Sequence, residues 1–157
     1  MKPAIGIKEE NRKEVALQLS KLLADEFVLY TKTRNAHWNV EGPDFHAMHL
    51  FFEGQYNQLD EIMDSVAERI RSIGHYAPAT LKSFLQLTHL SELNERDNGS
   101  KDFIRELLDD HESIIEFIRT NINRFANDYG DAGTSDFITG LMEDHEKMAW
   151  MLRAYFK

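Results

Sequence analysis

The chain has 157 residues, of which 42% are hydrophobic and 29% charged, a composition typical of one globular domain. It contains no cysteine, which excludes disulfides and thiolate metal sites. The formal net charge of −9 argues against a surface built for nucleic acid, since phosphates require clustered lysine and arginine, and makes cations the more natural partners.

The first predicted helix runs from about Asn11 to Asn39. Asn11 and Glu14 have the spacing of a capping box, and apolar residues such as Leu19 and Leu22 then recur at helical period.

The N-terminal sequence MKPAIGIKEENRKEV has no apolar region or cleavage site of a secretion signal, so we expect a cytoplasmic protein. We also expect no membrane span, because no apolar run approaches about 18–20 residues.

Three further long helices are predicted after the first. The second covers about Asp44 to Ile73 and stops at Gly74, since glycine commonly ends helices. The third covers about Ser100 to Asn127, and the fourth covers about Ser135 to Tyr155. The segment between the second and third helices is too long for a tight turn, but its apolar residues allow one short helix: Leu81, Phe84, Leu85 and Leu87.

This order of helices predicts the fold class. Two helix pairs with short joints and one long crossover describe an all-α, ferritin-like four-helix bundle with a short extra helix in the crossover. Strand-like alternation of apolar and polar residues is absent from the sequence. We therefore expect a single domain with no sheet.

The segment HWNVEGPDFHAMH places three of the seven histidines, His37, His46 and His49, around a Gly-Pro break. At 100° per residue, polar side chains of the second predicted helix fall on one sector beside its apolar face. This sector contains His46, His49, Glu53, Asp60, Asp64 and Glu68. A solvated acidic face is one interpretation. A metal site is the other, because histidine and carboxylate ligands without sulfur suit iron, manganese or zinc.

Two features decide where such a metal could bind. Ferritin-type bundles hold a metal pair inside the bundle with Glu-x-x-His motifs, and this chain contains none, so we disfavour an interior di-iron centre. Asp64 lies about 22 Å along the helix from His49, and Glu68 about 28 Å, so one straight helix cannot bring them together. Antiparallel second helices of two subunits, crossing near Asn57 to Leu59, would do so at two symmetric sites.

These residues strongly resemble the two motifs of the Dps family, the DNA-binding proteins from starved cells or miniferritins. The first motif stands here as HWNVEGPDFHAMHLFFE, from His37 to Glu53, and the second as MDSVAERIRSIG, from Met63 to Gly74. The resemblance extends over essentially the whole chain and implies one Dps-type domain over residues 1–157. It further implies a hollow dodecamer that oxidises Fe(II), preferentially with hydrogen peroxide and more slowly with oxygen, and stores the ferric mineral.

The resemblance also implies which residues bind iron at twofold subunit interfaces. His37, His49 and Glu53 would come from one subunit, and Asp64 and Glu68 from its partner. Zinc or manganese would be the expected substitutes for iron. Trp38, beside the site, is expected either to intercept a stray oxidising equivalent or to pack as an interface aromatic.

Other polar residues receive weaker expectations. The resemblance does not require His46, which we interpret as a polar residue near the helix start. His111 and His145 are each flanked by acids and are expected on solvated helix faces. In NDYGDAGTSD, Thr134 or Ser135 is expected to cap the fourth helix. Asp128, Asp131 and Asp136 of this segment are candidates for lining iron-entry pores, because rings of carboxylates concentrate cations.

The family name raises DNA binding, which we expect this chain to lack. Members that condense DNA generally use a mobile lysine-rich tail, whereas Lys2 and Lys8 are soon offset by Glu9 and Glu10. The leading interpretation is thus an iron oxidase and mineral store. The alternatives are a DNA-coating protection protein, disfavoured by the missing basic tail, and a purely structural helical oligomer, disfavoured by the intact ligand set.

Overall fold

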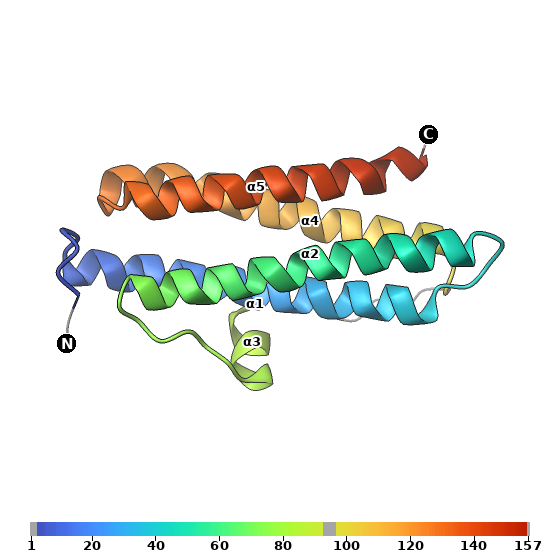
Figure 1. Cartoon of the computed structure of the whole chain (residues 1–157), viewed down its shortest axis with the longest axis horizontal. Coiled ribbons are helices and arrows are strands. Elements are labelled where there is room, and N and C mark those ends of the chain that lie inside the picture. The colour runs from blue at the N-terminus through green and yellow to red at the C-terminus, as the bar shows by residue number, and fades with distance from the viewer. Residues whose placement is uncertain (1–2, 93–96, 157) are drawn as a thin grey trace.

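The computed structural model describes residues 3–92 and 97–156. Its four long helices are α1 (Glu9–Asn39), α2 (Phe45–Ser72), α4 (Ser100–Asn123) and α5 (Ala132–Arg153). They lie alongside one another in one bundle, with the α1–α2 pair packed against the α4–α5 pair (Figure 1). No β-strand occurs among the residues described. The predicted all-α four-helix bundle is therefore confirmed.

The hydrophobic core occupies the axis of the bundle, and all four long helices contribute to it. Large side chains buried from solvent include Leu19 and Leu29 on α1, Phe52 and Leu59 on α2, Phe103 and Leu107 on α4, and Met148 and Leu152 on α5. Buried apolar residues recur on each helix at intervals of three or four positions, as at Leu19, Leu22 and Leu23 of α1, and so lie on one face of it. Burial of this apolar surface is what holds the helices together.

The first helix begins at Glu9, and the capping box predicted for Asn11 and Glu14 is wrong. The N-cap position is Lys8, which makes no side-chain cap bond. Asn11 lies within the first turn, and its Nδ2 donates to the backbone oxygen of Tyr129, 3.1 Å away. The predicted capping residue instead ties the start of α1 to the turn before α5.

The predicted end of α2 at Gly74 is confirmed. Gly74 has φ +95°, a backbone conformation that glycine adopts at no steric cost. The N–H of His75 donates to the oxygen of Ile70 at 3.1 Å, and the N–H of Gly74 donates to the oxygen of Arg71 at 2.9 Å. These two bonds satisfy carbonyls that the last helical turn would otherwise leave without donors.

The later helices differ from the prediction at their ends. α4 is followed by a π-helical turn, Arg124–Asp128, and α5 by a 3-10 turn, Ala154–Phe156. α5 begins at Ala132, and its N-cap is Asp131, whose Oδ1 accepts from the N–H of Thr134 at 2.8 Å. The sequence had predicted Thr134 or Ser135 as the cap, so that assignment is wrong.

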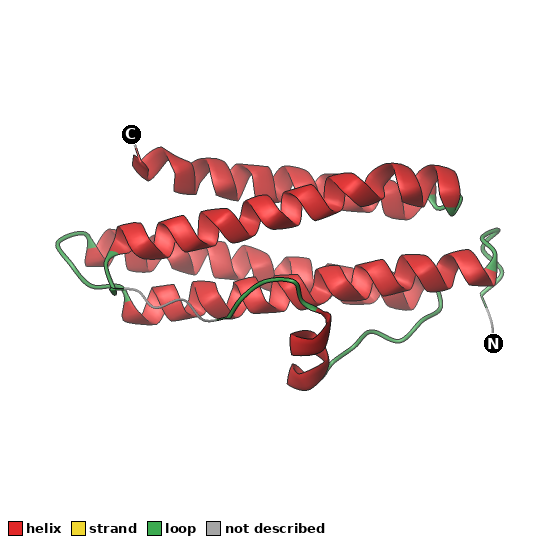
Figure 2. Cartoon of the chain, turned by 180° about the vertical axis from the view of Figure 1, so that it is seen from behind, coloured by secondary structure: helices red, strands yellow, loops and turns green. Residues whose placement is uncertain are grey.

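The crossover between α2 and α4 contains the predicted short helix, α3 (Leu81–Leu87). Figure 2 shows α3 standing beside the bundle, joined to it by extended segments. Asp25 of α1 fastens the segment after α3: its Oδ1 accepts from the hydroxyl of Thr88 at 2.7 Å and from the N–H of His89 at 2.9 Å. Across the described ranges, no helix is both long and apolar enough to cross a membrane.

Candidate metal centre

His37 and His49 hold each other in place across the joint between α1 and α2. Nδ1 of His37 lies 2.8 Å from the backbone oxygen of His49, and Nδ1 of His49 lies 2.8 Å from the backbone oxygen of His37. Their rings stack with centroids 3.7 Å apart. A carbonyl oxygen can only accept, so each Nδ1 carries a proton, and in the neutral imidazole each Nε2 then has a lone pair. This tautomer suits metal binding through Nε2.

Aromatic side chains enclose the histidine pair. The Tyr56 ring meets His37 edge-on at 5.1 Å, and the Phe45 ring lies 5.4 Å from His49. The guanidinium of Arg34 lies 4.2 Å from the centre of the Tyr56 ring and 5.3 Å from that of Trp38. His37 is 8% exposed, so these contacts and the backbone bonds leave its ring little freedom to move.

The carboxylates predicted as ligands all lie on α2, but not all at the same end. Glu53 is half-buried one turn after His49, whereas Asp64 and Glu68 are exposed further along. α2 is an unbroken helix from Phe45 to Ser72, so Asp64 and Glu68 stay about 22 and 28 Å from His49 at the normal helical rise. No three His, Asp or Glu side chains of the described residues are grouped to hold a metal.

The surroundings of the two ends of α2 differ. Near the histidines, two large aromatic side chains are exposed, Trp38 at 66% and Phe45 at 45%. Near the acids, Asp64 lines a groove whose other walls are largely apolar. Those walls include Leu23, Phe27, Met63, Ala67 and Phe84. Exposed aromatics at one end and an apolar groove at the other are what an antiparallel pair of copies could match.

The three acidic residues considered for pores have different environments. Asp128 and Asp136 are exposed. That they line pores stays a prediction. Asp131 is 2% exposed, and its carboxylate is already in use. Besides capping α5, it accepts from the hydroxyl of Thr134 at 2.6 Å and pairs with Arg69 of α2 at 3.2 Å. The structure gives Asp131 a role in joining α2 to α5 in place of the predicted pore lining.

His111 and His145 do not lie on solvated faces, so that expectation is wrong. Both are fully buried in the bundle, as is Glu26 of α1. Nε2 of His145 lies 2.7 Å from Oε1 of Glu26, and the Nδ1 atoms of the two histidines lie 2.9 Å apart. The flanking acids misled the sequence interpretation, although Ile114 and Leu141, three and four residues away on the two helices, indicate the buried face.

A second polar cluster joins the crossover to the bundle. Nδ1 of His89 lies 2.7 Å from Oδ2 of Asp25, and its Nε2 lies 2.9 Å from Oγ of Ser113. Burial raises the pKa of Asp25, with an opposing effect from its hydrogen bonds. A carboxylate, an imidazole and a serine hydroxyl in this order also occur in enzymes with a nucleophilic serine. Those sites additionally need backbone N–H groups that bind the oxyanion of the intermediate. Ser113 lies in the middle of α4, where those N–H groups serve the helix, so we interpret the cluster as a fastening.

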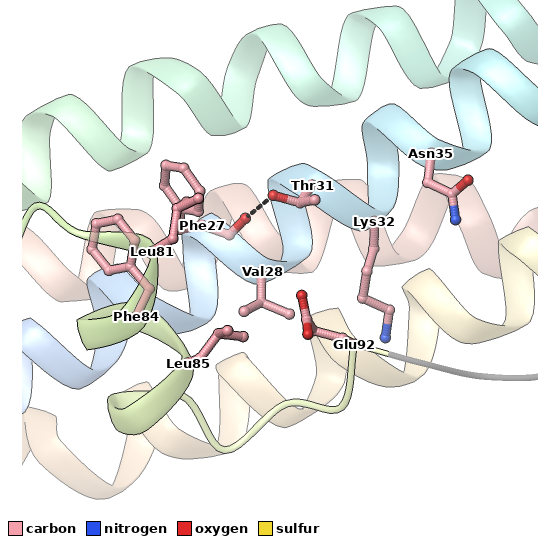
Figure 3. Close-up of a pocket in the computed structure, with 9 residues that line it drawn as sticks. All are labelled: Phe27, Val28, Thr31, Lys32, Asn35, Leu81, Phe84, Leu85 and Glu92. Atoms are coloured by element: carbon pink, nitrogen blue, oxygen red, sulfur yellow. Dashed lines mark hydrogen bonds between the residues drawn. The ribbon is translucent and has the colours of Figure 1, made fainter.

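A cavity opens between α1 and α3 (Figure 3). In Figure 3, Leu81, Phe84 and Leu85 of α3 face Phe27 and Val28 of α1. Lys32 also reaches this wall, but its ammonium already pairs with Asp110 and with Glu106 at 2.9 Å. The remaining lining is mostly apolar, and nothing in it resembles the imidazole pair described above.

Comparisons with known proteins agree with this architecture. The chain matches the family model for the ferritin-like domain over residues 16–157. It is 39% identical to a low temperature-induced protein of Nostoc over 96% of this chain and 84% of that protein. It is 33% identical to a DNA protection during starvation protein of Helicobacter pylori over 87% of this chain and 94% of that one. A crystal structure of a Dps protein from Vibrio cholerae superposes with a TM-score of 0.92 at 29% identity, covering 99% of this chain and 97% of the other.

Proposed function

Because this chain belongs to the Dps group of the ferritin-like family, we propose that it is an iron-storage protein that oxidises Fe(II) at sites shared between two subunits. Hydrogen peroxide is the preferred oxidant and oxygen a slower one. The observation that carries this proposal is the reciprocal bonding of His37 and His49, which engages each Nδ1 with a backbone carbonyl and leaves Nε2 as the nitrogen for a metal. A hydrogen bond from the other ring nitrogen, to a carboxylate, a backbone carbonyl or water, is how proteins orient imidazole ligands.

The site needs a second copy of the chain because one α2 helix cannot fold back on itself. In an antiparallel pair of α2 helices, His37, His49 and Glu53 of one subunit meet Asp64 and Glu68 of the other. The exposed Trp38 and Phe45 would then cover apolar surface at the groove beside Asp64. Such burial contributes to association. The twofold arrangement gives two sites per dimer.

The chemistry assigned to the site is a two-electron reduction of peroxide. Two Fe(II) ions give one electron each, one hydrogen peroxide takes both electrons and two protons, and two waters and two Fe(III) ions result. The imidazoles and carboxylates bind and position the iron substrate, and the small number of protein ligands leaves positions open for peroxide. Trp38 lies beside His37 of the histidine pair in sequence. Its role is either to intercept a stray oxidising equivalent or to pack at the subunit interface only.

The larger assembly follows from the same proposal. The mineral produced at the sites is stored in a hollow oligomer, for which the family suggests twelve subunits, and this protects the cell from oxidative damage. Iron would enter through pores lined by acidic side chains, with Asp128 and Asp136 as candidates. No appreciable DNA binding is expected from a chain of net charge −9.

The first prediction is that two different inactive variants restore each other. His37→Ala and Asp64→Ala should each lower the rate of peroxide-driven Fe(III) formation by about tenfold or more, because each removes a ligand. His46→Ala is the matched control, since His46 is exposed on α2, the helix that also carries Asp64, and is not a proposed ligand. The rate is followed by absorbance after anaerobic Fe(II) loading.

The two variants are then unfolded together and refolded as a mixture. A mixed dimer has one site with both changes and one site with neither, so random pairing restores about a quarter of the sites. A site formed within one chain would give no recovery on mixing. Unchanged rates in both single variants would show that this is not the reacting site at all.

A further inference from the structure

The middle of the bundle contains a chain of three ionisable side chains that the proposed function does not use. Glu26 of α1, His145 of α5 and His111 of α4 are all fully buried. They are joined by contacts of 2.7 Å between Glu26 and His145 and of 2.9 Å between the two imidazoles. Ionisable groups are rarely placed in a dry core, because burial strongly penalises their charged forms.

The contact between the histidines fixes how many protons the chain can hold. Two Nδ1 atoms 2.9 Å apart share one proton, since one must donate and the other accept. With Glu26 ionised, Nε2 of His145 donates to Glu26 and Nδ1 of His111 donates to His145. Nε2 of His111 is then a lone pair, and it is buried without a hydrogen-bond partner among the described residues.

One added proton is tolerated in this arrangement, but a second is not. The first converts His145 into an imidazolium beside the Glu26 carboxylate, which makes the three side chains neutral as a group. A second proton would charge His111 with no anion within hydrogen-bond reach. Burial, and next the charge of His145, hold the pKa of His111 well below its ordinary value.

Other charged groups around the chain do not replace the missing anion. On α1, Asp25 is engaged by His89, and Lys32 pairs with Glu106 and Asp110 of α4. From α2, the one buried polar side chain in the described ranges is Gln55, which carries no charge. Asp25 titrates as well, but its surroundings would be the same in a variant that changes His111 alone.

We propose that Glu26, His145 and His111 form an acid-sensitive switch that loosens the packing of α4 against α5 when the protein is acidified. In the unfolded chain both histidines titrate with a pKa near 6.5. Below that pH the unfolded state binds more protons than the folded state, because His111 resists protonation. The free energy of unfolding therefore falls as the pH falls below about 6.5. It stops falling only below the pKa that His111 has in the folded protein.

The test compares the pH dependence of unfolding in the protein and in His111→Asn. The asparagine amide can still donate to His145 but cannot titrate. Urea unfolding is measured between pH 8 and 5 at one protein concentration. The unfolding equilibrium constant of the unchanged protein should rise by up to about tenfold more per pH unit than that of the variant below pH 6. A constant loss of stability in the variant does not affect this difference in slope.

Two further measurements make the result independent of how well the variant folds. His46→Asn, which changes an exposed histidine, should keep the pH slope of the unchanged protein. In imidazole NMR of the folded protein, His111 should not titrate between pH 8 and 6. Equal slopes in His111→Asn and the unchanged protein would overturn the switch. Titration of His111 near pH 6.5 in the folded state would overturn it as well.

Discussion

At the scale of single residues, a histidine's role here is decided by which groups meet its two nitrogens. In His37 and His49, carbonyls occupy Nδ1 and leave Nε2 for a ligand. In His145, Glu26 and His111 occupy both nitrogens. His89 is likewise engaged on both sides, by Asp25 and Ser113. Histidine thus serves as a candidate metal ligand at His37 and His49, as part of a buried hydrogen-bonded chain at His145, and as a link between the crossover and the bundle at His89.

Asp131 shows how much one buried carboxylate can hold together. Asp131→Ala removes the N-cap of α5 and the partner of Arg69, so it should lower the free energy of unfolding by about 1–3 kcal/mol. Asp136→Ala, a change of an exposed residue on the same helix, should stay within about 0.5 kcal/mol. Urea unfolding at neutral pH measures both changes. Equal effects in the two variants would contradict the capping role.

At the scale of elements, the continuity of α2 keeps its histidine end and its acidic end apart, which is why the proposed site takes residues from two chains. Its 28 residues run without a break, so the end that carries His49 and the end that carries Asp64 and Glu68 lie far apart. The joint before α2 bends sharply enough to stack His37 on His49. The crossover after α2 starts at Gly74, and Asp25 fastens its far part. The joint before α2 therefore positions His37 against His49, and the crossover after α2 positions Thr88 and His89 against Asp25.

Two glycine substitutions should change stability in opposite directions. At Gly74, a Cβ would lie 2.4 Å from Pro3 Cγ and the backbone has positive φ, so Gly74→Ala should cost about 1 kcal/mol or more. Gly140 lies within α5 with open space around it, so Gly140→Ala should gain about 0.5–1 kcal/mol from helix propensity. Thermal unfolding at equal protein concentration compares them. Destabilisation by Gly140→Ala would show that another surface packs there.

At the scale of the whole molecule, charge sets which partners can approach. Twelve chains of net charge −9 would total about −108, which repels a polyanion. The protein should therefore leave plasmid DNA unshifted in a gel at 150 mM salt without added divalent metal. A basic Dps-type protein with a lysine-rich tail is the positive control. Retardation of the plasmid under these conditions would revive the DNA-coating alternative.

The sequence by itself determined the class of fold and the composition of the candidate site. Helical periodicity and Gly74 located the helices, because helix formation and termination depend on residues close together in the chain. If His49, Asp64 and Glu68 bind one metal, their spacing already requires two chains, since helical rise is a local constant.

Only the tertiary structure decided contacts between residues distant in sequence. It paired His111 with His145 and Glu26, used Asp131 to join α2 to α5, and bonded the Nδ1 atoms of His37 and His49 to each other's backbone oxygens. Flanking acids made His111 look solvated, but burial depends on which face of α4 meets the other helices. That choice is made by packing across the whole bundle, which no local pattern specifies.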